Sequence, residues 1–481
     1  MICKSNLLWK VALGALFLAT TSSCDKVLDQ EPPAAFTTEE GYSTPARIAS
    51  SALGMYDGLQ NAEFLGGRAL IYSDVRSDDT DPAAYFGTIS NSTYLAGDAT
   101  VQLAWQGGYR TIYAVNFFLQ QLQAHPGIAP ADLEAQYTGE GKYIRALTMF
   151  HLVNLFAQPY NYTAGASHLG IPIQLVAPDA NSAFETGQNL SRATVAEVYT
   201  QIETDLNDAI NNLPETYTTN FNKTGRATKD AARALLSRVA LYKGDYSGAG
   251  RLAGEVITGG RHALNPSPLT PFRTFSTSES IFSVAMNSAD NPNTNNAIGQ
   301  HYGATGARSD ITITPYINIP TSQFPATDLR RTLLTTRSAS NNQYYTLKFG
   351  GIAGAASADW VPISRYPEVL LNRAESLVRT TNTVNADAFA LLNQVRGRST
   401  TPYAVGTFTT PDQLLNAILL ERRLELAFEG HRLYDLLRNK QGVPARGSAA
   451  AQPYGSQKLV LPIPLREIQQ NPNLVQNEGY N

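Results

Sequence analysis

Apolar residues recur at helical spacing through most of the chain. Residues 194–197 read T-V-A-E, the form of a capping box, and apolar side chains then follow every three or four residues up to Leu213, where Pro214 ends the run. Residues 141–159 are apolar on nearly every face, which indicates a helix buried on all sides. This periodicity predicts a protein built mainly from helices.

Two segments have the pattern of helical hairpins. In residues 226–257 a helical run is interrupted at Gly244 and resumes at Tyr246. Small residues such as Ala249 allow the two halves to pack closely, as in a tetratricopeptide unit. A similar pair recurs at residues 366–398. The spacing between the pairs is irregular, so we expect divergent and interrupted repeats.

Residues 260–345 have a different character, because Asn, Thr, Gly and Pro dominate them. Short alternating runs such as residues 311–317 predict small strands. A long irregular region inside a protein of this size is usually functional or disordered. Beyond it, Thr410 and Pro411 predict the start of a helix that Gly430 interrupts. The Pro- and Asn-rich C-terminal tail is expected to lie extended across the surface.

These patterns predict an all-α fold, a tetratricopeptide-like scaffold of helical hairpins with a loop-rich second lobe that contains only short strands. We expect a single domain over residues 46–481. It divides into an N-terminal helical part (46–258), the loop-rich lobe (259–362), and C-terminal helices with an extended tail (363–481). Residues 24–45 are predicted to form a polar tether, because three prolines discourage helix there: Pro32, Pro33 and Pro45.

The N-terminus has the three parts of a secretory signal. Lys4 and Lys10 provide a positive start, residues 11–19 are apolar, and small residues precede Cys24. The apolar run is too short to cross roughly 30 Å of hydrocarbon as a helix. We therefore predict a signal peptide over residues 1–23. A Cys placed directly after the small residues resembles a bacterial lipoprotein signal, in which Cys24 becomes the lipid-bearing first residue; an ordinary signal peptide with an incidental Cys is the alternative.

Composition and charge narrow the class of protein. The chain has 481 residues and two cysteines, and Cys3 would be lost with the signal, so no internal disulfide is expected. The net charge of −3 becomes −5 without Lys4 and Lys10, which argues against sequence-independent binding of nucleic acid. Charged residues make up only 16% of the chain, below the usual quarter. No second apolar stretch is long enough to predict a transmembrane helix.

Motifs for metal or cofactor chemistry and for nucleophilic catalysis are missing from the sequence. The six histidines are scattered and form no H-E-x-x-H pattern, and neither a phosphate-binding loop nor a G-x-S-x-G elbow occurs. The one cysteine left in the mature chain is assigned to lipid. We expect no metal, no cofactor and no enzymatic activity.

Acidic residues offer the strongest case for catalysis, because glycosidases use paired carboxylates. Glu421, Glu425 and Glu429 fall at i, i+4 and i+8 on one helix face. Three arginines lie close by in sequence and favour a structural ion-pair network instead: Arg422, Arg423 and Arg432. A second acidic run, D-V-R-S-D-D-T-D at residues 74–81, offers oxygen ligands for Ca²⁺ but lacks the spacing of a calcium loop. We expect this run to be solvated or to brace a loop.

Four segments, taken together and in order, resemble the SusD/RagB family of lipoproteins. They are RALTMFHLVNLFAQPYN (145–161), SRYPEVLLNRAESLVR (364–379), ERRLELAFEGHRLYDLLR (421–438) and LPIPLREIQQNPNLVQNEGY (461–480). The family more often has Ala where Pro367 stands here, which suggests that a helix starts at this point. With the lipoprotein signal, the resemblance spans nearly the whole chain.

The resemblance implies a lipid-anchored protein on the outer face of the outer membrane of a Bacteroidetes-type bacterium. Such proteins bind a nutrient, usually a glycan or oligosaccharide, and deliver it to a TonB-dependent transporter of the SusC type, without performing chemistry. Three alternatives stay open: an oligopeptide-binding RagB-type lipoprotein, a helical-repeat scaffold that binds only proteins, and a glycan-cleaving enzyme.

Candidate ligand residues are aromatics on loops, because sugars are held by flat aromatic faces together with planar polar side chains. The resemblance implies that loops of the early segment and of the later lobe form the ligand site. The candidates are Tyr85, Phe86, Tyr94, Tyr302, Tyr316, Tyr344, Tyr345 and Trp360. Trp105 has helical spacing with Tyr109, so we expect it in the core. The scarcity of exposed Trp leaves a smaller or less planar ligand open, including a peptide.

Overall fold

The structure, a computed structural model, describes residues 37–179, 189–304, 307–350 and 356–480. Within these ranges helices dominate and the strands are short, so the predicted all-α class is confirmed. The predicted signal peptide and the lipid site Cys24 lie outside the described residues. None of the helices in the described part combines the length and the apolar character that crossing a bilayer requires.

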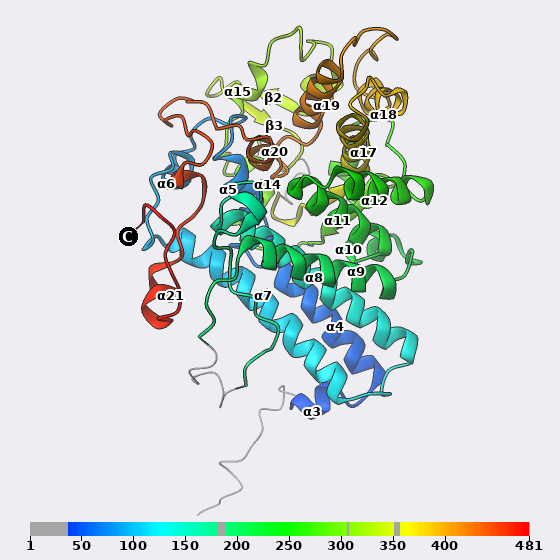
Figure 1. The fold of residues 1–481 in the computed structure, drawn as a ribbon, viewed down its shortest axis with the longest axis vertical. Coiled ribbons are helices and arrows are strands. Elements are labelled where there is room, and N and C mark those ends of the chain that lie inside the picture. Colours follow the sequence, from blue (N-terminus) through cyan, green and yellow to red (C-terminus); the bar gives the residue numbers. More distant parts are fainter. Residues whose placement is uncertain (1–36, 180–188, 305–306, 351–355, 481) are drawn as a thin grey trace, which may run out of the picture.

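The N-terminal part is a series of packed helices (Figure 1). α7 packs on α8, α8 on α9, α9 on α11, and α11 on α12, which confirms the expected hairpin scaffold. Its helices are α3 (Thr38–Gly41), α4 (Pro45–Leu59), α5 (Arg68–Asp74), α6 (Gly87–Ser90), α7 (Ala99–Ala124), α8 (Ala131–Phe156), α9 (Val195–Asn212), α10 (Asn220–Gly225), α11 (Lys229–Lys243) and α12 (Tyr246–Thr258), with a 3-10 turn at Ala164–Ala166.

Capping and small residues set the boundaries and the close packing of these helices. Thr194 caps α9 in the predicted capping box. Gly244 ends α11 in a left-handed conformation, with φ of 81°. Gly108 on α7 faces Leu152 on α8 so closely that a Cβ atom would lie 2.7 Å from the leucine side chain. Pro45, expected to discourage helix, instead occupies the first turn of α4, where its missing N–H is not needed.

The later lobe contains short helices and two small antiparallel sheets. β1 (Ser280–Val284) pairs with β4 (Val361–Arg365), and β2 (Thr335–Arg337) pairs with β3 (Tyr344–Thr346). Its helices are α13 (Pro271–Thr274), α14 (Ile298–Tyr302), α15 (Thr314–Ile317) and α16 (Leu329–Leu333), with a 3-10 turn at Ala356–Ala358.

One predicted strand in this lobe is wrong. Residues 311–317 form no strand: Ile311 and Ile313 are buried in the core, and α15 follows. Pro315 explains the difference, because it lacks the N–H that a sheet would use but fits the first turn of a helix.

The C-terminal part adds a second hairpin and a long tail. Its helices are α17 (Tyr366–Thr381), α18 (Ala386–Gly397), α19 (Pro411–Glu425), α20 (Arg432–Arg438) and α21 (Leu465–Gln470), with a 3-10 turn at Gln457–Leu459. α17 packs on both α12 and α18, and Pro367 lies in its first turn, as expected. Thr410 caps α19 and Gly430, with φ of 79°, separates it from α20.

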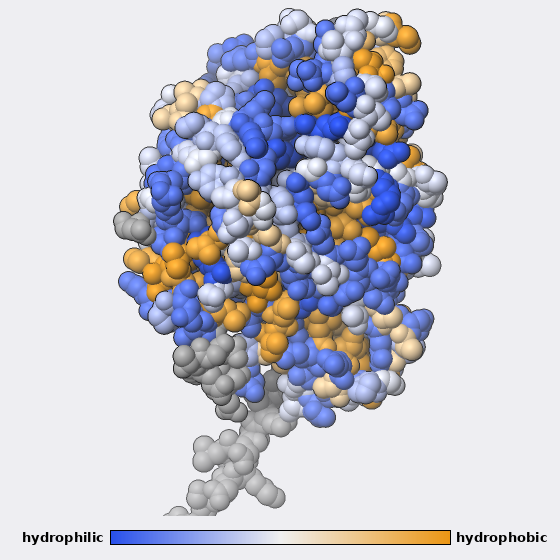
Figure 2. Space-filling view, in the orientation of Figure 1, coloured by the Kyte–Doolittle hydropathy of each residue, from blue (hydrophilic) through white to orange (hydrophobic). Residues whose placement is uncertain are grey.

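The C-terminal tail runs along the helical part, in red in Figure 1. The N–H of Leu461 donates to the carbonyl oxygen of Leu155, at the end of α8, over 2.8 Å. The tail is not extended throughout, because α21 interrupts it. On the face shown in Figure 2, apolar side chains gather around the region where Figure 1 places α7 and α21.

Candidate functional site

Tyr85 is the exposed aromatic side chain of the early loop that meets the later lobe. Its side chain is 43% exposed. The ring centroid lies 4.9 Å from that of Phe86 and 5.2 Å from that of His301, which begins the last turn of α14. The guanidinium of Arg308 lies 4.3 Å from the centre of the Tyr85 ring, in cation–π contact. The phenol is thus held in place while much of its surface stays open to solvent.

Arg68 at the start of α5 fixes the Tyr85 hydroxyl. Its Nη2 donates to Tyr85 Oη over 2.9 Å and to the carbonyl oxygen of Asn295 over 2.7 Å. Its Nη1 pairs with Glu63 Oε2 at 2.6 Å. Because Arg68 is nearly buried, these contacts connect α5, the Tyr85 loop and the Asn-rich segment before α14.

Planar polar groups surround the phenol on the side of the later lobe. Asp310 Oδ2 lies 2.8 Å from His301 Nδ1 and accepts from Arg308 Nε over 2.9 Å. Arg308 Nη1 donates to Asn295 Oδ1 over 3.0 Å. Burial lowers the pKa of His301, and the facing Asp310 carboxylate partly offsets this. Guanidinium, amide and carboxylate groups around a partly exposed aromatic ring, with Arg308 over one face, form a set that can bind the hydroxyls of a sugar.

Five of the eight candidate ligand aromatics are packed in the core, each with at most 4% of its surface exposed: Phe86, Tyr94, Tyr302, Tyr316 and Tyr345. Their rings offer no free face, so the structure does not support a direct stacking role for them. The tyrosine hydroxyls among them have internal partners; for example, Tyr302 donates to Asp74 Oδ2 over 2.9 Å, and Tyr316 donates to the carbonyl oxygen of Leu424 over 2.9 Å. The five were predicted on loops, but Tyr302 lies in α14, Tyr316 in α15 and Tyr345 in β3, and only Phe86 and Tyr94 lie outside helices and strands.

The other candidates are Tyr85, Tyr344 and Trp360, and they do not form one site. Tyr344 lies on β3 beside Arg337. Trp360 donates from Nε1 to the carbonyl oxygen of Met286 over 2.8 Å and stacks on Phe275. Only Tyr85 stands in a charged and polar array, together with the buried Phe86 and with His301.

The carboxylates on α19 and beyond form a buried ion-pair network, as predicted, but with other partners. Glu425 contacts Arg398, Arg365 and Arg330. Glu429 pairs with Lys348 at 2.6 Å. The three arginines that are close in sequence point elsewhere: Arg422 to Asp435, Arg423 to Asp79, and Arg432 to Asp78.

This network is unsuited to acid catalysis. Burial raises the pKa of Glu425, but Arg398, Arg365 and Arg330 outweigh it and hold the pKa below its usual value. Burial raises the pKa of Glu421, yet its side chain is only 1% exposed. No substrate reaches either carboxylate in this arrangement.

The acidic run at residues 74–81 braces the early loop. Asp74 accepts from the backbone N–H of Gly430 over 3.1 Å. Asp78 accepts from Arg432 Nε over 2.6 Å, and Asp81 accepts from the hydroxyl of Thr312 over 2.7 Å. In the described ranges no three His, Cys, Asp or Glu side chains are grouped so that they could hold a metal ion. The loop-bracing interpretation is therefore confirmed, and it explains how the Tyr85 loop is positioned.

Sequence patterns did not identify the arginine and histidine partners of Tyr85, or the aspartate that contacts Arg308 and His301. Arg68 and Asn295 are separated by 227 positions. No local pattern brings such residues together, so only the tertiary structure reveals them.

Comparison with known proteins gives consistent matches. Residues 26–241 match a family described as "Starch-binding associating with outer membrane", and residues 331–480 match one described as "SusD family". The SusD-like protein P2 of Formosa agariphila is 26% identical, over 98% of this chain and 99% of its own length. The starch-binding protein SusD of Bacteroides thetaiotaomicron is 31% identical over 131 residues, 25% of this chain and 21% of its own. A crystal structure of a SusD superfamily protein from Bacteroides fragilis has a TM-score of 0.79 and 27% identity, and covers 90% of this chain and 99% of its own.

Proposed function

The chain belongs to the SusD/RagB family, and from this membership we propose that it is a cell-surface lipoprotein that binds a glycan. It delivers the glycan to a TonB-dependent outer-membrane transporter of the SusC type. The observation that carries the proposal is the partly exposed Tyr85 ring within its array of planar polar groups, in a chain whose residues 26–241 match a family described as starch-binding.

The Tyr85 site has the chemistry that a neutral sugar needs. The C–H groups of a sugar cover an aromatic ring, and its hydroxyls both donate and accept hydrogen bonds. Arg308 supplies donors, Asp310 an acceptor, and Asn295 both. Because these groups already hold one another, they are preorganised for a ligand. We place the glycan here and assign no catalytic step to the chain.

Titration calorimetry tests the ligand and the site together. We expect saturable binding of soluble starch or laminarin fragments, and a loss of about fivefold in affinity for Tyr85→Ala, since aromatic contacts of this kind are worth about 1 kcal/mol. Tyr162→Ala is the matched control, because Tyr162 is also exposed, at 39%, and lies outside the site. If Tyr85→Ala binds with unchanged affinity, the assignment of the ligand site to Tyr85 is wrong.

The same panel separates the alternatives. Binding of oligopeptides alone would favour the RagB-type peptide interpretation. Failure to bind any small ligand, with a barrel protein co-purifying, would favour the protein-only scaffold. Release of sugar from a polysaccharide would favour the interpretation that the protein is a glycan-cleaving enzyme.

The lipid anchor at Cys24 is part of the proposal. One acyl chain holds a protein to a membrane only marginally, whereas two or more hold it firmly. We expect Cys24→Ala to move the protein from the membrane fraction to the soluble fraction of cells. If the variant stays with the membrane, the anchor is not at Cys24.

A further inference from the structure

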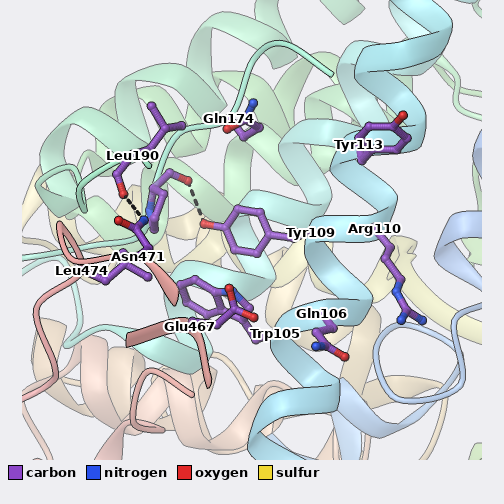
Figure 3. Close-up of a pocket in the computed structure, with 11 residues that line it drawn as sticks. Trp105, Gln106, Tyr109, Arg110, Tyr113, Gln174, Leu190, Glu467, Asn471 and Leu474 are labelled. Carbon is purple, nitrogen blue, oxygen red and sulfur yellow. Dashed lines mark hydrogen bonds between the residues drawn. The ribbon is translucent and has the colours of Figure 1, made fainter. Parts of the chain in front are cut away.

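A second cavity, of about 440 Å³, lies between α7 and the C-terminal tail (Figure 3). Its walls come from one face of α7, from Pro172 and Gln174, and from α21 with the turn that follows it. It shares no residue with the Tyr85 site. Its volume is in the range of small-molecule sites, about 300–1,000 Å³.

Three aromatic side chains line this cavity at i, i+4 and i+8 on α7: Trp105, Tyr109 and Tyr113. At a rise of 1.5 Å per residue they follow one another at intervals of about 6 Å along the helix. Trp105 is fixed from behind by the edge of Phe156, with ring centroids 5.0 Å apart. Tyr109 donates from Oη to the carbonyl oxygen of Pro172 over 2.8 Å, and Tyr113 is 45% exposed. The row therefore runs from a buried indole to an open phenol.

Two polar groups face the inner end of this row without partners. The indole Nε1–H of Trp105 has no hydrogen-bond acceptor, and the carboxylate of Glu467 has no donor, among the described residues. Figure 3 shows the Glu467 side chain beside the Trp105 ring. Burial raises the pKa of Glu467, with Arg466 opposing. Neither group is among the buried polar atoms that lack a partner, so both are reached by solvent and are free to bond a ligand that donates and accepts.

The charges around the cavity select a neutral ligand. Arg110 stands on the same wall as Gln106, and neither has a side-chain partner among the described residues. A cation would be attracted by Glu467 and repelled by Arg110, and an anion would experience the reverse, so a ligand with a single net charge gains little here. Hydroxyl groups satisfy both, because each hydroxyl is a donor and an acceptor.

We propose that this cavity is a second saccharide site, which binds two or three units of a neutral glycan. The C–H faces of the sugar cover the rings of Tyr109 and Tyr113, because Trp105 is only 4% exposed. Glu467 accepts from the sugar hydroxyls, and Trp105 Nε1–H donates to one of them. The site is separate from the Tyr85 site, so either can exist without the other.

Tryptophan fluorescence gives a direct readout. Of the three tryptophans, Trp9 belongs to the predicted signal, so a mature chain carrying Trp360→Phe has Trp105 as its only indole. With Tyr85→Ala also present, the first site is weakened. We expect maltotriose, laminaritriose or cellotriose to change the Trp105 emission saturably. Glu467→Ala should weaken this response at least tenfold, and Glu255→Ala, an exposed acid on α12, should leave it unchanged.

Four results would overturn the proposal. These are no emission change with any trisaccharide, a change that Glu467→Ala and Gln106→Ala both leave intact, a response to peptides alone, or a response to charged sugars alone. Saturation-transfer NMR on the Tyr85→Ala chain with Trp360 retained checks that the outcome does not arise from misfolding. If only the second site is wrong, ligand binding that depends on Tyr85 remains. If the proposed function is wrong, that binding is absent as well, so the two failures can be distinguished.

Discussion

Replacing Glu425 with Gln tests whether the acidic face of α19 stabilises the fold or performs chemistry. The substitution keeps the shape of the side chain and removes its charge. The Glu425 carboxylate is 3% exposed and lies 3.2 Å from Arg365 and 3.5 Å from Arg330, in addition to its contact with Arg398. Glutamine would also turn an amide N–H₂ toward one or more of these guanidinium groups.

The expected loss of stability depends on which carboxylate partners each arginine keeps when Glu425 is replaced. Removing one partner of a buried ion pair destabilises a protein by about 3–5 kcal/mol. Arg398 and Arg365 both keep Glu279, each at 2.6 Å, and Arg330 keeps Asp328 at 2.7 Å. We therefore expect a decrease in the free energy of unfolding near the lower limit, about 3 kcal/mol at pH 7.

Urea unfolding followed by circular dichroism measures this loss. The pKa of Glu425 is lowered in the folded chain, so its stabilisation is fully present above the unfolded value of 4.5 and is lost as the pH falls below it. The loss in Glu425→Gln should shrink accordingly in acid. Glu255→Gln is the control; its pair with Arg251 is exposed, and we expect a change under about 1 kcal/mol. Equal stability of Glu425→Gln and the parent chain would refute the argument, and loss of a glycan-cleaving activity would show that the residue is catalytic.

Three further substitutions test other parts of the fold, all by urea unfolding. Burial raises the pKa of Asp230, but hydrogen bonds from His262 and Arg261 bring it down to about 2. Asp230→Asn should therefore lower the free energy of unfolding by about 2 kcal/mol at pH 7. The difference from the parent chain should fade as the pH falls from about 4 to about 2. Gly108→Ala should lose about 1–3 kcal/mol, because its methyl group would overlap Leu152. Gly244→Ala meets open space but keeps a positive φ, so about 1 kcal/mol is expected; a larger loss at Gly244 than at Gly108 would contradict the packing argument.

Local signals predicted the helical framework well. Capping boxes at Thr194 and Thr410 and the left-handed turn at Gly244 depend on residues within a few positions of one another, so the sequence contains what is needed to place them. The strand prediction for residues 311–317 was wrong because alternating apolar and polar residues indicate which side chains are buried, but not whether a second strand lies alongside to pair with them. The helix in the tail, Leu465–Gln470, was missed because its six residues carry no buried side chain and hence no apolar period.

The site was predicted less well, for a different physical reason. An aromatic residue in a loop segment fits both a ligand platform and a core position, and only burial separates the two. Tyr85 and Phe86 are neighbours in sequence, yet one is 43% exposed and the other 4%. Both environments depend on the later lobe: His301 packs against both rings, and Arg308 lies over Tyr85. Sequence patterns place neither residue beside the early loop.

One of the segments that carry the family resemblance, residues 421–438, acts on the site from a distance. Arg423 and Arg432 hold Asp79 and Asp78, and Gly430 donates to Asp74. These contacts fix the loop that precedes Tyr85, while none of them reaches a ligand. A motif of this kind therefore identifies the scaffold and does not specify a ligand. Differences in ligand between relatives should instead lie in exposed side chains that the scaffold does not use, such as Tyr85 in the first site and Tyr113 in the second.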